Sequence, residues 1–225
     1  MSDLMDTAER AAPSADSFCE CDGGIGEPRP LVCVPIRSRF ESGATYTEFL
    51  ARAVTHKELW DSLSKRAQVA PDLLARAAAL RRSWQLLVLS DDWCGDSLNT
   101  LPYLARLVEQ IPQLDLRILP RDTNLDLMDS HLTGTSRSIP VVMALDAASC
   151  ERGWWGPRPT ELQAWVRSQG MTLPKEERYK YVRMWYARDR GRTAIEELLR
   201  SLEEHERNDP GEPQAAPPAS TPDQP

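Results

Sequence analysis

The first clear periodicity of apolar residues begins after a long polar segment. Residues 1–28 are rich in alanine, serine, aspartate, glycine and proline and have no apolar periodicity, which is typical of a disordered segment. Thr45, followed by Glu48, forms a capping box that starts a stretch with apolar residues at helical spacing. We therefore expect order to begin near Thr45 and residues 1–44 to be largely disordered, with the apolar residues 31–36 lying against the domain as extended chain.

From Thr45 onward the apolar pattern changes between the helical period and the strand period. A helix is predicted from Thr45 to about Lys65, and a second helix starts at Pro71. A continuous apolar run follows at 84–90 and is typical of a strand that is buried on both faces. The elements predicted after it are a helix over 97–111, a strand over 114–119, a short helix over 124–131, a buried strand over 139–145, a hairpin strand over 150–155 and a helix over 160–169.

This order of elements predicts an α/β fold in which helices cover a mixed sheet. A further helical stretch over 175–206, interrupted near Gly191, predicts helical additions that pack back on the domain. The ordered domain is thus predicted to span 45–206. The last residues, 207–225, are rich in proline, and we expect them to be a disordered tail.

The composition supports one soluble domain and argues against several classes of partner. The chain has 225 residues, of which 41% are hydrophobic, enough for one core. Its net charge of −7 argues against binding to nucleic acid or anionic lipid, and no run approaches the ~18 apolar residues of a membrane span. Because the N-terminus lacks the basic start and apolar centre of a secretory signal, we expect a cytoplasmic protein.

The cysteines do not form a recognisable scaffold or metal site. The five cysteines are Cys19, Cys21, Cys33, Cys94 and Cys150. An odd number in a cytoplasmic chain argues against a disulfide scaffold. The chain has no Cys-x-x-Cys pair and its three histidines are isolated, whereas a zinc site needs about four converging ligands. We expect no metal and no cofactor; Cys19, Cys21 and Cys33 would be the contributors if a metal site existed.

Cys94 lies where the predicted strand 84–90 gives way to the helix that follows. The N–H groups and the positive end of a helix stabilise a thiolate, so this position favours a nucleophilic cysteine. Ser97 places a hydroxyl one helical turn away, and Trp93 would shield one side of the sulfur. The alternative is that Cys94 is a small buried apolar residue, as free cysteines often are.

A second feature is the proline that opens the predicted strand over 139–145. Proline is out of place in a buried strand unless it starts the strand or lies at an edge. Pro140 is therefore either an ordinary trans proline at the start of the strand or a cis proline that shapes a substrate groove together with Ile139.

Together, these residues resemble the thioredoxin superfamily. The likeness consists of the motif Trp93-Cys94-Gly95-Asp96-Ser97 after a buried strand, then a helix, a strand and a helix, and then Ile139-Pro140 opening the next strand, 46 residues beyond Cys94. Pro102 and Gly156 also stand about where the superfamily has a helix proline and a glycine. The resemblance covers roughly residues 80–170 and is nearest to bacterial thioredoxin-family proteins with a WCGDS motif and a later Arg-Ser-Ile-Pro.

The resemblance implies a thioredoxin-like mixed sheet flanked by helices, with extra helices at both ends of the domain. It also implies that Pro140 is cis and lies against Cys94. The backbone of its neighbour Ile139 would then pair with an extended substrate. On this basis Cys94 and Ser97 are the expected catalytic residues. The expected substrate-binding residues are Trp93, Gly95, Asp96, Ile139 and Pro140.

The chain departs from the superfamily at the position of the second cysteine. Ser97 stands there, and a hydroxyl can stabilise a thiolate but cannot resolve a mixed disulfide. A buried acid that the superfamily often carries six residues before the reactive cysteine is replaced by Val88. The acids Asp91, Asp92 and Asp96 lie close to the motif and would oppose thiolate formation if they are unpaired.

We therefore predict a monothiol redox protein that acts through Cys94 on protein disulfides or low-molecular-weight thiols. An external thiol, Cys150, Cys19 or Cys21 would resolve the mixed disulfide. In a third mechanism Cys94 would help to bind an iron–sulfur cluster, as the Cys-Gly-Phe-Ser glutaredoxins do with glutathione. The main rival is a redox-inactive thioredoxin-like binding or adaptor module. Since adjacent rings cannot both face inward on a strand, one of Trp154 and Trp155 should be exposed.

Overall fold

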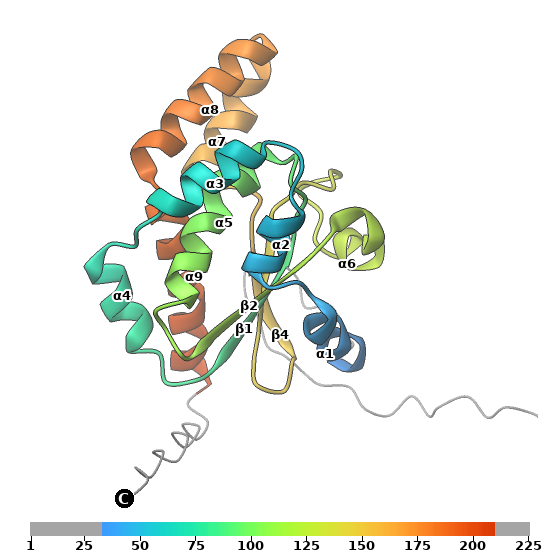
Figure 1. The fold of residues 1–225 in the computed structure, drawn as a ribbon, viewed down its shortest axis with the longest axis vertical. Helices are drawn as coiled ribbons and strands as arrows, with labels where there is room; N and C mark the ends of the chain where they lie inside the picture. Colours follow the sequence, from blue (N-terminus) through green and yellow to red (C-terminus); the bar gives the residue numbers. More distant parts are fainter. Residues whose placement is uncertain (1–32, 210–225) are drawn as a thin grey trace, which may run out of the picture.

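The computed structural model describes residues 33–209, and its centre is a four-stranded mixed sheet (Figure 1). The strands are β1 (Trp84–Leu89), β2 (Leu114–Leu119), β3 (Val141–Leu145) and β4 (Glu151–Trp155), in the order β2-β1-β3-β4. Strand β1 is parallel to β2 and antiparallel to β3, and β4 is antiparallel to β3. The predicted α/β fold with a mixed sheet is confirmed.

Helices cover both faces of this sheet. They are α1 (Cys33–Ser42), α2 (Tyr46–Arg52), α3 (Lys57–Arg66), α4 (Pro71–Ala78), α5 (Gly95–Val108), α6 (Leu125–Asp129), α7 (Thr160–Ser168), α8 (Lys175–Asp189) and α9 (Arg192–Asn208), with short 3-10 turns at Arg121–Thr123 and Gly170–Thr172. None of the helices within 33–209 is long and apolar enough to cross a membrane.

The side chains of β1 alternate between two hydrophobic clusters, as the period of a strand requires. Leu86 and Val88 pack in the larger cluster with α3, α4, α5 and α9. Leu87 and Leu89 point to the other face, where α1 and α6 pack with Cys94. Figure 1 shows α4 and α9 on one side of the sheet and α1 and α6 on the other. A third, smaller cluster joins α7 to α8.

The ordered domain begins earlier than the sequence pattern predicts. Helix α1 precedes Thr45, and residues 33–36, which were expected to be extended, are helical. Pro35 falls in the first turn, where a helix makes no use of the missing N–H. Ile36 and Phe40, one turn apart, are both buried on the second face of the sheet. The predictions for residues 1–32 and 210–225 lie outside the described residues.

The helix predicted from Thr45 to Lys65 is two helices, α2 and α3. The capping box at Thr45 is present as predicted. The break between the helices occurs where the Asp92 carboxylate accepts hydrogen bonds from the backbone N–H groups of Val54 and Thr55, at 2.7 and 2.8 Å. This contact spans 38 residues of sequence, so local periodicity does not predict it. The break near Gly191, between α8 and α9, is confirmed.

Some tryptophans lie in the core and others on the surface. Trp155 is 9% exposed and Trp154 is 41% exposed, which confirms that one of the two adjacent rings faces outward. Trp60 and Trp84 are almost completely buried in the larger cluster.

His205, on α9, is a group through which we expect the stability of the fold to depend on pH. Its ring packs edge-on against Trp84, with 5.3 Å between ring centroids, and its Nε2 is buried. Burial, and then the nearby charge of Arg152, lower the pKa of His205, although Asp209 opposes the shift. The unfolded chain, whose histidines titrate near ~6.5, therefore binds more protons below that pH than the folded chain does. We expect the folded state to lose stability as pH falls from 7 to 5.

The measurement is the free energy of unfolding by urea at several pH values for the wild type and the His205→Gln variant. We expect the variant to lose less stability than the wild type as the pH falls. Parallel curves for the two proteins would contradict the assignment to His205.

Candidate functional site

Cys94 caps the N-terminus of α5, directly after the loop that leaves β1. Its backbone is extended, with φ −81° and ψ 117°, and its Sγ accepts a hydrogen bond from the Ser97 N–H at 3.5 Å. The thiol in turn donates to the Ile139 carbonyl oxygen at 3.2 Å. The sulfur therefore lies between the start of a helix and the segment that leads into β3, with 7% of the residue exposed.

The Ile139–Pro140 peptide bond is cis, and both residues are buried directly before β3 begins at Val141. Because β1 and β3 pair antiparallel, the last residue of β1, Leu89, lies beside the first residue of β3, Val141. This antiparallel pairing brings Ile139 to Cys94 across 45 residues of sequence.

Ser97 is completely buried beside the sulfur. Its hydroxyl has no hydrogen-bond partner among the described residues. The hydroxyl and the backbone N–H of Ser97 both favour the thiolate and work to lower the pKa of Cys94. Ser97 is therefore placed to donate a hydrogen bond to a Cys94 thiolate once it forms.

The net effect on Cys94 is nevertheless a raised pKa. Burial is the largest cause, because it disfavours the charged form, and the negative charge of Asp96 adds to it. The contributions of Ser97 and of the α5 N–H groups do not outweigh these two. Most Cys94 is therefore a thiol at neutral pH.

The Asp96 side chain points into the protein, toward Arg158 and Tyr186. Its carboxylate accepts hydrogen bonds from the Arg158 guanidinium, at 2.9 Å to Oδ1 and 2.5 Å to Oδ2, and from the Tyr186 hydroxyl at 3.0 Å. Burial raises the pKa of Asp96, and the charge of Arg158 opposes this effect. The three side chains join α5, the loop after β4 and α8 immediately behind the reactive cysteine.

Trp93 and Gly95 are the members of the motif that face outward. The Trp93 ring is 44% exposed, and the Arg121 guanidinium stacks on it at 4.7 Å from the ring centroid. Arg121 also donates a hydrogen bond to the Arg137 carbonyl, which ties this stack to the segment before Pro140. No atom lies within 4 Å of a Cβ placed on Gly95, so the backbone there is open to an approaching chain.

The structure thus brings together most residues predicted for the site. Cys94, Ser97, Ile139 and Pro140 meet around the sulfur, and Trp93 and Gly95 form the exposed rim. Asp96 is set apart from them. Sequence patterns missed three residues, namely Arg158, Tyr186 and Arg121, because each reaches the motif only through tertiary contacts.

Cys150 lies at the opposite end of the β3–β4 hairpin from Cys94. It stands in the turn after β3, immediately before Glu151, whereas Ile139 precedes the start of β3. A five-residue strand separates the two ends by roughly 15 Å, so Cys150 is not placed to resolve a Cys94 disulfide in this conformation. Cys19 and Cys21 lie outside the described residues. Within 33–209, no three His, Cys, Asp or Glu side chains form a group suited to a metal ion.

Comparisons with known proteins agree with this geometry. A protein of unknown function from Pseudomonas aeruginosa is 20% identical in sequence, with a TM-score of 0.61 over 73% of this chain and 95% of that chain. An HIV epitope scaffold is 18% identical, with a TM-score of 0.60 over 75% of this chain and 97% of that chain. At these identities the likeness shows the fold alone.

The sequence comparisons are more specific. No curated protein matches the chain. The family model described as thioredoxin matches residues 43–178, more than half of the chain, and this range includes both Cys94 and Pro140. The chain therefore belongs to the thioredoxin family.

Proposed function

We propose that the protein is a monothiol redox protein in which Cys94 exchanges with disulfides and an external thiol completes the cycle. The observation that supports this most strongly is the position of the Cys94 sulfur, between the Ser97 N–H and the Ile139 carbonyl before cis-Pro140. When the thiol loses its proton, its bond to the carbonyl is lost. The sulfur keeps the Ser97 amide as a donor and can accept a second hydrogen bond from the buried Ser97 hydroxyl.

The proposed reaction has two balanced steps. The Cys94 thiolate attacks a disulfide R–S–S–R′, which forms a mixed disulfide between Cys94 and RS and releases R′S⁻. A low-molecular-weight thiolate R″S⁻ then attacks the RS sulfur of this mixed disulfide, which releases the Cys94 thiolate and forms R–S–S–R″. A second R″S⁻ that attacks R–S–S–R″ completes the reduction, which releases RS⁻ and forms R″–S–S–R″. The two electrons therefore come from two external thiols, because Ser97 cannot supply a second sulfur.

The other site residues bind the disulfide. The exposed ring of Trp93 and the open backbone at Gly95 border the sulfur on one side, and Ile139 with Pro140 borders it on the other. The substrates in this proposal are protein disulfides or disulfides of low-molecular-weight thiols, and the cytoplasm is the compartment that supplies the resolving thiol. Asp96 acts only through Arg158 and the charge near Cys94.

The raised pKa of Cys94 sets how the activity should depend on pH. A small share of thiolate at neutral pH slows the attack, while the greater intrinsic nucleophilicity of a more basic thiolate partly compensates. The rate of exchange should therefore still rise with pH above the range in which an ordinary cysteine titrates, near ~8.5.

The test is the rate at which the protein forms a mixed disulfide with 2-hydroxyethyl disulfide, followed by mass spectrometry of the Cys94 peptide. We expect the Cys94→Ser variant to lose essentially all glutathione-dependent reduction of this disulfide. The matched control is Cys150→Ser, which removes a second cysteine that is buried in the described part of the chain and should keep the wild-type rate. An unchanged rate in Cys94→Ser would refute the redox proposal.

A binding or adaptor role is the second candidate, and one observation favours it. Cys94 is buried and its pKa is raised by that burial and by Asp96, which is the opposite of what most reactive cysteines show. If the wild type accelerates no exchange at any pH up to 9.5, the adaptor role becomes the better proposal.

A further inference from the structure

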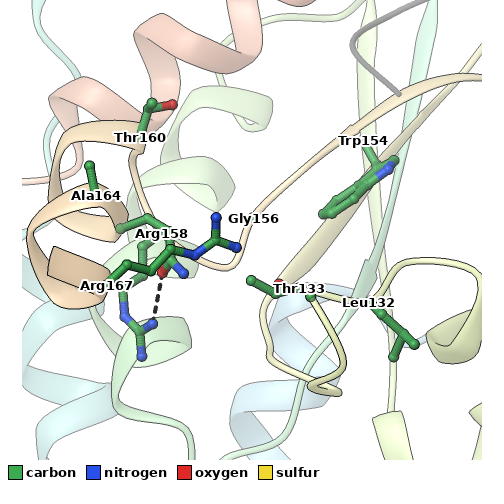
Figure 2. Close-up of a pocket in the computed structure, with 10 residues that line it drawn as sticks. Leu132, Thr133, Trp154, Gly156, Arg158, Thr160, Ala164 and Arg167 are labelled. Atoms are coloured by element: carbon green, nitrogen blue, oxygen red, sulfur yellow. Dashed lines mark hydrogen bonds between the residues drawn. The ribbon is translucent and has the colours of Figure 1, made fainter. Parts of the chain in front are cut away.

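A cavity of about 320 Å³ is lined by none of the residues predicted to be catalytic or substrate-binding, although Arg158 forms part of its wall. It lies between the loop at residues 132–134, the end of β4 and helix α7. Figure 2 shows Arg158 and Arg167 on one side of this cavity and Trp154 with Leu132 on the other. The volume is at the lower end of the range of small-molecule sites, so it suits a small ligand rather than a protein segment.

The lining of the cavity is basic, although the protein as a whole carries a net charge of −7. Arg158 and Arg167 line it, and none of its ten lining residues is acidic. Gln163 and Thr160 add polar side chains from α7, and the exposed ring of Trp154 supplies an apolar wall. This combination suits a ligand that has an anionic end and an uncharged remainder.

The two arginines have different surroundings. The Arg158 guanidinium is held by Asp96 and donates to the Gln163 side-chain oxygen at 3.0 Å. Arg167 is exposed, and within residues 33–209 no carboxylate forms an ion pair with it. Arg167 therefore offers its charge to a ligand, while Gln163, whose oxygen is used by Arg158, still has its amide N–H groups to donate. A guanidinium binds a carboxylate in a planar, two-bond geometry.

One wall of the cavity adjoins the segment that contacts the reactive sulfur. Gly156 in its wall lies so close to Pro140 that a Cβ there would be 2.1 Å from the Pro140 carbonyl oxygen. Pro140 follows Ile139, whose carbonyl accepts the Cys94 thiol. Burial acts to lower the pKa of Arg158. The negative charge of Asp96, with smaller contributions from groups that include Cys94, outweighs burial, so the pKa is raised.

We propose that this cavity binds the carboxylate of a low-molecular-weight disulfide and so directs that disulfide to Cys94. The inference rests on the proposed function and narrows its substrate class to small disulfides that carry a carboxylate. The carboxylate binds Arg167 and Gln163, and the chain of the ligand packs on Trp154. The Cys94 thiolate then attacks the disulfide, forms a mixed disulfide with the carboxylate-bearing half and releases the other half as a thiolate.

The test compares three disulfides that differ in charge: 3,3′-dithiodipropionate, which is a dianion, cystamine, which is a dication, and neutral 2-hydroxyethyl disulfide. The full-length protein is reacted with each at low ionic strength, and the second-order rate constant for modification of the Cys94 peptide is measured. We expect the dianion to react about tenfold faster than the dication, as charge complementarity steers association.

Variants of Arg167 test whether this residue causes the preference for the dianion. In Arg167→Gln the dianion-to-dication ratio should fall to about twofold, and in Arg167→Glu it should fall below one, since surface charge pairs contribute up to about 1 kcal/mol, or about fivefold. The matched control is Arg200→Gln, which removes an exposed arginine of α9 and should keep the wild-type ratio.

The outcomes separate this inference from the function on which it rests. If the wild type reacts with none of the three disulfides above the uncatalysed rate, the proposed function fails. If it reacts with the neutral disulfide but shows no preference for the dianion, or keeps its preference in Arg167→Gln, the redox function stands and the carboxylate site is refuted.

Discussion

Replacement of Gly156 by alanine is expected to destabilise the protein by roughly 3–5 kcal/mol, which combines the cost of a strained backbone with that of an overpacked contact. Gly156 has φ +132°, a conformation open essentially only to glycine. A Cβ there would lie 2.1 Å from the Pro140 carbonyl oxygen and 3.4 Å from the Val141 Cα. These are backbone atoms, which cannot move without shifting the start of β3. The measurement is the free energy of unfolding by urea.

The matched control for this substitution is Gly153→Ala, in strand β4 three residues before Gly156. A Cβ on Gly153 meets only the Ser201 hydroxyl, at 3.5 Å, an ordinary contact with a side chain that can rotate. We expect that variant to stay within about 1 kcal/mol of the wild type. Equal stabilities for the two variants would show that the close approach of Gly156 to Pro140 does not exist in solution.

The Asp96→Asn substitution should make Cys94 react about tenfold faster with iodoacetamide at pH 7.5. The Arg158 guanidinium, no longer paired with a carboxylate, would favour the Cys94 thiolate. Burial and the charge of Asp96 are the two largest causes that raise the pKa of Cys94. Asparagine keeps an acceptor for Tyr186 but removes the negative charge, so the cation of Arg158 is no longer neutralised. The pKa of Cys94 should therefore fall. The measurement is the alkylation rate of the Cys94 peptide as a function of pH.

This gain in reactivity should be accompanied by a loss of stability. Asp96 and Arg158 form a mostly buried pair, with 13% and 21% of their side chains exposed, and removal of one partner from such a pair costs about 3 kcal/mol. The matched control is Asp129→Asn at the end of α6, which breaks an exposed pair with Arg137 and should change neither property by much. A slower alkylation of Cys94 in Asp96→Asn would contradict the role given to this carboxylate.

Much of the fold follows from local patterns. The continuous apolar run at 84–90 predicts β1 because both faces of that strand are buried, and the two clusters that share its side chains confirm this. The prediction was wrong at the N-terminal side, where α1 forms before Thr45. Its ten residues have only weak apolar periodicity, and the helix is stabilised by the packing of Ile36 and Phe40 against the sheet rather than by its own sequence.

The same contrast holds at the site. The strand-to-helix junction at Cys94 and the proline at 140 are local features, and each could be assigned from its neighbours in sequence. The pairing of Asp96 with Arg158 and Tyr186 spans 62 and 90 residues, and no local pattern predicts such a contact. The mostly buried ion pair of Asp96 is therefore known only from the structure.

The sequence by itself determined that a cysteine stands at the start of a helix without a second cysteine one turn later, because these are matters of order and spacing along the chain. Only the tertiary structure decided the direction in which the pKa of that cysteine is shifted. Burial depth, the charge of Asp96 and its neutralisation by Arg158 arise where three distant segments pack together. The pKa of Cys94 depends on the distances between those segments, which spacing along the sequence does not contain.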